Sequence, residues 1–270
     1  MKKLKIGIIG CGAMGSEIAL SCQNNLSGRV EVFAICDIDP AKMAALNGRL
    51  KRKARPLGLS DIIEKSDFII EAASAKISAG ILSECIKMRR DCLLMSVGGL
   101  LGNESLLSRA ESRGIKVYIP SGALCGIDGL KSASIGKIES VTLTTRKPPK
   151  GLIGAPYLKR KGIDLGKIKE ETVIFEGSAL DAVKAFPQNV NVSAVLSLAG
   201  IGAKKTRVRV VTSPGYTKNM HEVEVTGSFG RIFAKTENVP SKANPKTSAL
   251  AIFSALSMLE GLTKNIRIGN

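Results

Sequence analysis

Three closely spaced glycines near the start of the chain constrain its fold more than any other feature. They lie in "LKIGIIGCGAMGSEIALSC", where residues 5–9 predict a short buried strand and residues 16–22 predict a helix. Gly10, Gly12 and Gly15 form G-x-G-x-x-G between them. The first glycine of such a unit permits a tight turn, the second lets a pyrophosphate approach the backbone, and the third lets helix and strand pack closely. The amino end of the helix then offers unpaired N–H groups to phosphate.

The strand that follows strengthens the prediction of a dinucleotide site. "VEVFAICD" ends at Asp37, 22 residues beyond the last glycine. A carboxylate there can accept hydrogen bonds from the ribose of NAD and repels a 2′-phosphate, so NAD is favoured over NADP. Arg49 and Lys51 would make NADP acceptable if their loop folded back. Asp37 could instead cap the next helix, but Asp39 suits that role better because Pro40 follows it. We therefore predict that the cofactor is bound by Gly10, Cys11, Gly12, Ala13, Met14, Gly15 and Asp37.

Strands and helices continue to alternate as far as residue 124. The helical patterns "SAGILSECIKMRRD" and "NESLLSRAESRG" separate short apolar strands, which predicts a Rossmann-like, doubly wound parallel sheet. Ligands of such sheets bind beyond the carboxyl ends of the strands. Small residues there, at 72–74, 96–99 and 121–126, would let a cofactor lie close to the backbone, and ordinary loop residues are the alternative at each place. The predicted contacts are Ala73, Ser74, Gly122 and Ala123.

The second half of the chain has a different pattern. "ESVTLTTRKPP", "ETVIFEGSA", "RVRVVTSP" and "HEVEVTG" alternate polar and apolar residues, which predicts an α+β domain on a mostly antiparallel sheet with one covered face. One helix is expected at about residues 179–198. We predict a dinucleotide-binding domain at 1–125, a substrate and dimerisation domain at 126–244, and a terminal helix within 245–270 that packs back on the first domain.

Four polar residues of the second half are candidates for substrate binding. Asn189 and Asn191 flank Val190 near the start of an apolar helical run; one of them can cap that helix and leave the other to face a ligand. Arg146 and Lys147 lie at a predicted strand end, where they could bind a carboxylate. A solvated rim is an equally good interpretation of these two cations.

His221 is the only histidine in the 270 residues, and it lies at the entrance to a predicted strand. A single histidine is more often structural than catalytic. Its ordinary pKa of about 6.5 would nevertheless let it orient a substrate or transfer a proton near neutral pH.

Composition narrows the classes of partner. The formal charge of +17 suits polyanions, including dinucleotides and dicarboxylates, but the aromatic content is only 4% and no nucleic-acid-binding module is recognisable. Six cysteines without a CxxC pair or zinc-ligand spacing indicate a reducing compartment and no metal. The apolar segments are too short or too rich in glycine for a membrane span, so we expect a cytoplasmic protein.

Several of these motifs together resemble one family, the L-aspartate dehydrogenases of the NAD-biosynthesis type. The resemblance covers essentially the whole chain. It is carried by "GIIGCGAMG", "SGALCGIDGL", "TRKPP", "FPQNVNVSA", "HEVEVTGSFG" and "NPKTSALAIFSAL". The glycine motif is common to many families, whereas the later motifs in this order are much more specific.

The resemblance implies NAD(P)-dependent oxidation of L-aspartate to iminoaspartate, which hydrolyses to oxaloacetate and ammonia or passes to quinolinate synthase. It implies a homodimer, a catalytic role for His221, and cofactor contacts from Ala123 and from Asn189 or Asn191. Two alternatives remain at this point. One is another two-domain NAD(P) oxidoreductase, similar to dihydrodipicolinate reductase or homoserine dehydrogenase. The other is a non-catalytic NAD sensor that binds nucleic acid.

Overall fold

The chain folds into two compact units, each with its own sheet. The structure, a computed structural model, describes residues 3–187, 191–241, 248–266 and 268–269. Met1–Pro120 and Ile252–Ile266 form the first unit, and Ser121–Ala251 with the last four residues forms the second. The division after Pro120 falls five residues before the boundary expected from the sequence.

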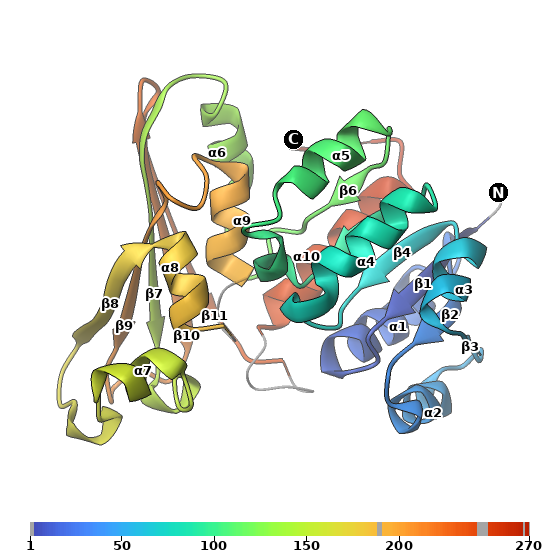
Figure 1. The fold of residues 1–270 in the computed structure, drawn as a ribbon, viewed down its shortest axis with the longest axis horizontal. Helices are drawn as coiled ribbons and strands as arrows, with labels where there is room; N and C mark the ends of the chain where they lie inside the picture. Colours follow the sequence, from blue (N-terminus) through green and yellow to red (C-terminus); the bar gives the residue numbers. More distant parts are fainter. Residues whose placement is uncertain (1–2, 188–190, 242–247, 267, 270) are drawn as a thin grey trace. The chain divides into compact units, whose positions relative to one another are not determined.

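A parallel six-stranded sheet is the centre of the first unit (Figure 1). Its strand order is β3-β2-β1-β4-β5-β6, with parallel pairing throughout, which confirms the predicted doubly wound sheet. The chain runs outward from β1 on one side and returns to β4 on the other, so the switch point lies between these two strands. The strands are β1 Leu4–Ile9, β2 Val30–Cys36, β3 Arg55–Pro56, β4 Phe68–Glu71, β5 Asp91–Leu94 and β6 Val117–Tyr118.

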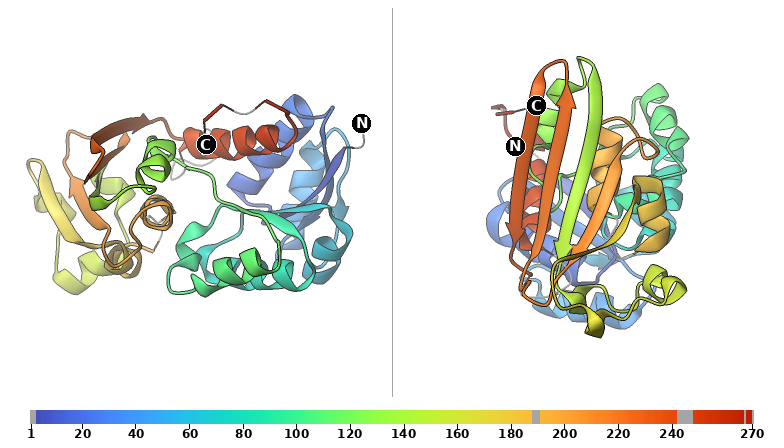
Figure 2. Two further views of the ribbon diagram at one scale, coloured as in Figure 1. Left: turned by 90° about the horizontal axis from the view of Figure 1, so that it is seen from above. Right: turned by 90° about the vertical axis from the view of Figure 1, so that its left-hand side faces the viewer.

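Helices cover both faces of this sheet, as parallel sheets require. Figure 2 shows α1 and α10 on one face and α4 on the other. Ile252, Ala255 and Leu259 of α10 are buried in the same apolar core as Ile6 and Ile8 of β1. The helices are α1 Ala13–Asn25, α2 Pro40–Arg49, α3 Leu59–Lys65, α4 Ala75–Lys87, α5 Ser105–Ser112 and α10 Ala249–Leu262, with a 3₁₀ turn at Val97–Leu100.

The second unit is built on a five-stranded sheet of order β11-β10-β7-β9-β8. Only β7 and β9 pair in parallel, so the predicted mostly antiparallel sheet is confirmed. Helices line one face, and the other face is left open (Figure 2). The elements are α6 Ile127–Ala133, β7 Ile138–Lys147, α7 Pro156–Lys161, β8 Thr172–Ser178, α8 Ala179–Ala185, α9 Asn191–Ala199, β9 Arg207–Thr212, β10 Asn219–Gly227 and β11 Gly230–Asn238, with 3₁₀ turns at Pro149–Gly151 and Leu165–Lys167.

The single helix expected at about residues 179–198 is in fact two helices, α8 and α9. The first ends at Ala185, and the backbone of the next residue, Phe186, leaves the helical region at φ −135° and ψ 63°. Pro187 follows it, and a proline sterically disfavours the helical conformation of the residue before it. The prediction of one helix was therefore wrong because it gave this proline too little weight.

The strands β7 and β10 separate their side chains cleanly between the two faces of the sheet. Val141 and Leu143 of β7 are buried, and so are their register partners Val225 and Val223 of β10. Because side chains alternate along a strand, the next odd-numbered positions, Thr145 and His221, lie on the same covered face. The even-numbered residues between them lie on the open face.

Gly15→Ala is expected to destabilise the first unit, because a Cβ there would lie 1.8 Å from the carbonyl oxygen of Gly10. Overpacking of this kind costs about 1–3 kcal/mol of unfolding free energy. Gly12→Ala is the matched control, since a Cβ at Gly12 meets nothing within 4 Å and φ is −71°. Urea unfolding monitored by circular dichroism measures both variants. Equal stabilities would contradict the packing argument.

Candidate functional site

The glycine turn after β1 leaves a space that fits a pyrophosphate. Gly10 has φ +100°, and a Cβ on it would lie 2.5 Å from the carbonyl oxygen of Ala72. Gly15 presses α1 against that same turn, while the position at Gly12, the first turn of the helix, is open. The backbone is therefore bare where a phosphate would meet the free N–H groups of α1. This arrangement fits the dinucleotide that the motif predicts.

Asp37 is tied directly to the glycine turn. Its Oδ2 accepts the backbone N–H of Cys11 at 2.7 Å, and its Oδ1 accepts the N–H of Asp39 at 2.9 Å. Asp39 caps α2 by accepting the N–H of Ala41 at 2.9 Å, as predicted. The lone pairs that remain on Asp37 can accept ribose hydroxyls. Burial, with a smaller effect from Asp37, also raises the pKa of the Cys11 thiol to about 12.

Two further features bear on which dinucleotide fits beside Asp37. Arg49 makes an exposed ion pair with Glu17 of α1 at 3.2 Å, which gives it a partner other than a 2′-phosphate. Ile38, which the sequence analysis did not single out, is 97% exposed. It directly follows Asp37, so the sequence already placed an exposed aliphatic side chain beside the predicted ribose ligand.

The other predicted cofactor contacts lie in two different units. Ala73 and Ser74 are exposed beyond the carboxyl end of β4, and Ser74 makes no side-chain capping bond to α4. Gly122, at φ +66°, and the buried Ala123 belong to the second unit. The carbonyl oxygen of Ala123 accepts the hydroxyl of Thr236 at 2.9 Å and the amide of Asn238 at 3.2 Å, which anchors this turn to β11.

His221 is buried on the covered face of the second sheet, with 4% of its surface exposed. Its Nδ1 lies 2.8 Å from the hydroxyl oxygen of Thr145, its register partner on β7. Burial, followed by the positive charge of Lys147, lowers the pKa of His221 to about 3. The expectation of an ordinary pKa therefore needs correction: in this environment the imidazole is neutral at pH 7.

Lys147 lies on the same covered face, two residues beyond Thr145 on β7. It is 7% exposed, and burial lowers the pKa of its ammonium to about 8. Thr145, Lys147 and Ser193 of α9 are the polar residues of a pocket that is otherwise lined by apolar side chains of β7, β9, α8 and α9. Ser193 was not predicted from the sequence, because only the packing of α9 against the sheet brings it to this place.

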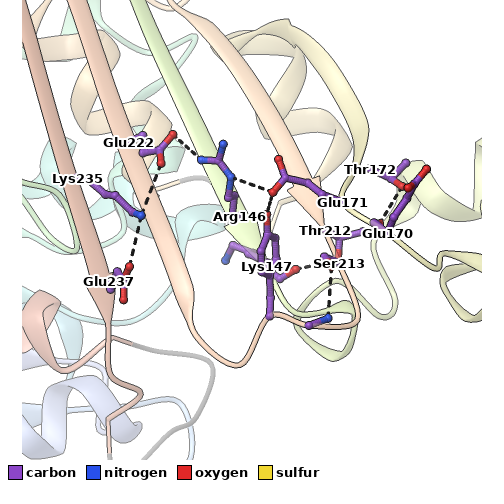
Figure 3. A network of polar contacts seen from close by, with 12 residues as sticks. Arg146, Lys147, Glu170, Glu171, Thr172, Thr212, Ser213, Glu222, Lys235 and Glu237 are labelled. Carbon is purple, nitrogen blue, oxygen red and sulfur yellow. Dashed lines mark hydrogen bonds and ion pairs between the residues drawn. The ribbon is translucent and has the colours of Figure 1, made fainter.

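Arg146 does not lie with this group, and its role in substrate binding stays a prediction. It lies on the open face of the sheet, in ion pairs with Glu222 and with Glu171, the latter at 3.6 Å (Figure 3). Lys235 lies 4.0 Å from the same Glu222 and 3.3 Å from Glu237. Alternation along β7 therefore directs Lys147 toward the covered face and Arg146 away from it.

The two candidate asparagines differ in what the structure says of them. Asn189 lies outside the described residues. Asn191 is exposed and begins α9, two residues before Ser193. The choice between them as the cofactor ligand stays a prediction.

Comparisons of the chain with family profiles, with curated proteins and with solved structures point to the same family. The family profile "Aspartate dehydrogenase, C-terminal" matches residues 128–262, and "Homoserine dehydrogenase, NAD binding domain" matches residues 10–120. L-aspartate dehydrogenases of Methanosarcina barkeri and Methanosarcina acetivorans are 45% and 46% identical to the chain, and each alignment covers 98% of this chain and 99% of the relative. The crystal structure of aspartate dehydrogenase from Thermotoga maritima is 26% identical, with a TM-score of 0.75 over 99% of this chain and 100% of that one.

The chain belongs to the L-aspartate dehydrogenase family. The resemblance seen in the motifs is thereby confirmed over nearly the full length. The first unit alone would have left homoserine dehydrogenases open, since its profile carries their name, and the second unit decides for the L-aspartate dehydrogenase family. No helix within the described ranges combines the length and apolar character needed to cross a bilayer.

The lowered pKa of His221 predicts a specific loss of stability in acid. The folded state keeps the imidazole neutral down to about pH 3, whereas the unfolded chain takes up a proton below its ordinary pKa of 6.5. The stabilisation that His221 contributes is therefore fully present above pH 6.5 and is lost as the pH falls. The free energy of unfolding drops by about 2 kcal/mol between pH 8 and pH 5.

Chemical denaturation of the protein and of His221→Gln across this range measures the effect. The difference in unfolding free energy between the two proteins should shift in favour of the variant as the pH falls. The chain has one histidine, so no other imidazole contributes. Parallel pH profiles for the two proteins would refute the assignment.

Proposed function

We propose that the chain catalyses the NAD(P)-dependent oxidation of L-aspartate to iminoaspartate, which water hydrolyses to oxaloacetate and ammonia. The observation that supports it most is the burial of Lys147 and His221 on one face of the second sheet, beside a pocket. The chain also belongs to the L-aspartate dehydrogenase family. NAD, when bound, accepts the hydride from the α-carbon. The glycine turn, Asp37 and the turn at Ala73 hold it, and the second unit supplies the groups that act on the substrate.

Lys147 is the group that suits a substrate carboxylate. Its ammonium is buried on the covered face of β7, and burial lowers its pKa to about 8. An ammonium–carboxylate hydrogen bond is charge-assisted and is stronger in a buried site than in water. The hydroxyls of Thr145 and Ser193 lie in the lining of the same pocket as Lys147.

His221 is the group that suits the proton of the substrate amine. Nδ1 of His221 and the Thr145 hydroxyl share a hydrogen bond, and in the tautomer in which Nδ1–H is the donor, the lone pair on Nε2 is an acceptor. Burial, followed by the charge of Lys147, lowers the pKa of this imidazole. A carboxylate bound to Lys147 would offset the second of these two effects and leave the first in place.

The same proposal extends to coenzyme and assembly. Asp37 favours NAD, because its carboxylate is held in place by two backbone N–H groups and repels a 2′-phosphate. A homodimer through the second unit is supported by the resemblance and by Phe233, which is 58% exposed on β11. Iminoaspartate that escapes hydrolysis would pass to quinolinate synthase. A reducing cytoplasm agrees with six cysteines that are all free thiols.

NADH formation at 340 nm, across a panel of amino acids with NAD or NADP supplied, tests the function. L-Aspartate with NAD should give the highest kcat/KM. His221→Ala should lower turnover by at least about 100-fold, the usual contribution of an acid–base group, and should still bind NADH. Absence of activity with L-aspartate would overturn the proposal, and full turnover by the variant would end the role of His221.

Lys147→Met should lower kcat/KM for L-aspartate on the order of 100-fold, because an ammonium–carboxylate hydrogen bond is lost from a buried site. NADH affinity should not change. Arg146→Met is the matched control: loss of a cation one residue earlier, on the opposite face of β7, should alter kcat/KM by less than about threefold, because its ion pairs with Glu171 and Glu222 lie away from the pocket that Lys147 lines. Steady-state kinetics measure both. A larger effect at Arg146 than at Lys147 would reverse the assignment.

A further inference from the structure

Glu71, the last residue of β4, is a carboxylic acid with no exposed surface at the edge of the first sheet where the cofactor is expected. Buried carboxyls are rare unless they are paired or hydrogen-bonded. Burial raises the pKa of Glu71, against hydrogen bonds from Ser96 and Ala73 that lower it. Neither the catalytic proposal nor the glycine motif gives this side chain a role.

Each carboxylate oxygen of Glu71 accepts a backbone N–H from a different turn. Oε1 accepts the N–H of Ala73 at 2.8 Å, in the turn between β4 and α4. Oε2 accepts the N–H of Ser96 at 2.9 Å, in the turn after β5. The carbonyl oxygen of Ser96 in turn accepts the buried hydroxyl of Ser78 on α4 at 2.9 Å. One side chain therefore joins the carboxyl-end turns of two neighbouring strands.

The glycine turn packs against the turn after β4, which Glu71 holds. A Cβ on Gly10 would lie 2.5 Å from the carbonyl oxygen of Ala72 and 2.7 Å from the nitrogen of Ala73. The backbone N–H of Ala72 also donates to the carbonyl oxygen of Ile9 at 2.8 Å. Movement of the Ala73 turn would consequently displace the backbone at Gly10, beside the predicted pyrophosphate position, as well as at Ser96.

The strand order says which half of the cofactor these turns would meet. The β1-β2-β3 half carries Asp37, which binds the adenosine ribose in such folds. The switch point lies between β1 and β4, so the β4-β5-β6 half is left for the nicotinamide. The turns at Ala73 and Ser96 are the carboxyl ends of β4 and β5.

We propose that Glu71 is a positioning residue for the nicotinamide half of the dinucleotide: its carboxylate clamps the turns after β4 and β5 in the arrangement that the ring requires, without touching the cofactor. This rests on the proposed cofactor site but not on the identity of the substrate. Glutamine cannot replace the carboxylate, because its amide has one acceptor oxygen and its NH₂ group would face an N–H donor.

The test compares two ligands that share the adenosine and pyrophosphate but differ in the nicotinamide. NADH and ADP-ribose are titrated into the protein, Glu71→Gln and Glu64→Gln, followed by NADH fluorescence and by calorimetry. Glu64 is an exposed glutamate of α3 in the same unit, so it controls for the chemical change. We expect Glu71→Gln to weaken NADH binding about tenfold, the loss of one charge-assisted hydrogen bond, and to change ADP-ribose binding less than twofold.

Two outcomes overturn the proposal: equal weakening of both ligands, which indicates only general damage to the unit, and unchanged NADH affinity. Because no aspartate is present, failure here is distinct from failure of the dehydrogenase proposal. Hydrogen exchange on the unchanged protein gives a second measurement that does not depend on the variant folding. The amides of Ala73 and Ser96 should be protected before any ligand is added, and rapid exchange at either would also overturn the proposal.

Discussion

The burial of Lys147 beside His221 is the interaction on which the chemistry of the second unit depends. Two ionisable groups on one covered face cannot both carry a positive charge without a large desolvation cost. The structure responds by lowering both pKa values, to about 8 for the lysine and about 3 for the histidine. At neutral pH the imidazole is therefore uncharged, whereas most of the lysine keeps its proton.

In the first unit, the predicted dinucleotide site depends on backbone geometry rather than on charge. A side chain on Gly15 would meet the carbonyl oxygen of Gly10, and one on Gly10 would meet the backbone of Ala72 and Ala73, while the position at Gly12 is open. Asp37 then links β2 to that turn through the N–H of Cys11. Two strands and one helix are thus joined at the glycine turn, which explains why this short motif identifies the fold.

The parts that the sequence predicted are those that local rules decide. The glycine motif, the cap at Asp39 and the change from a parallel to a mostly antiparallel sheet all follow from patterns within about ten residues. The alternation in "ESVTLTTRKPP" also predicts the face on which each cation lies. Lys147 shares the odd numbering of the buried Val141 and Leu143, and Arg146 does not. The prediction of a carboxylate site gave both cations the same role and left that parity unused. The contact of His221 with Thr145, 76 residues away, and the buried position of Glu71 depend on strand register and packing, which no local pattern specifies.

The thiol of Cys11 has a consequence for the durability of the cofactor turn. Only the thiolate reacts readily with peroxides and alkylating agents. Burial raises the pKa of the Cys11 thiol to about 12, so the protonated form dominates at neutral pH. The turn thereby keeps a small apolar residue in the middle of the glycine motif in its less reactive form.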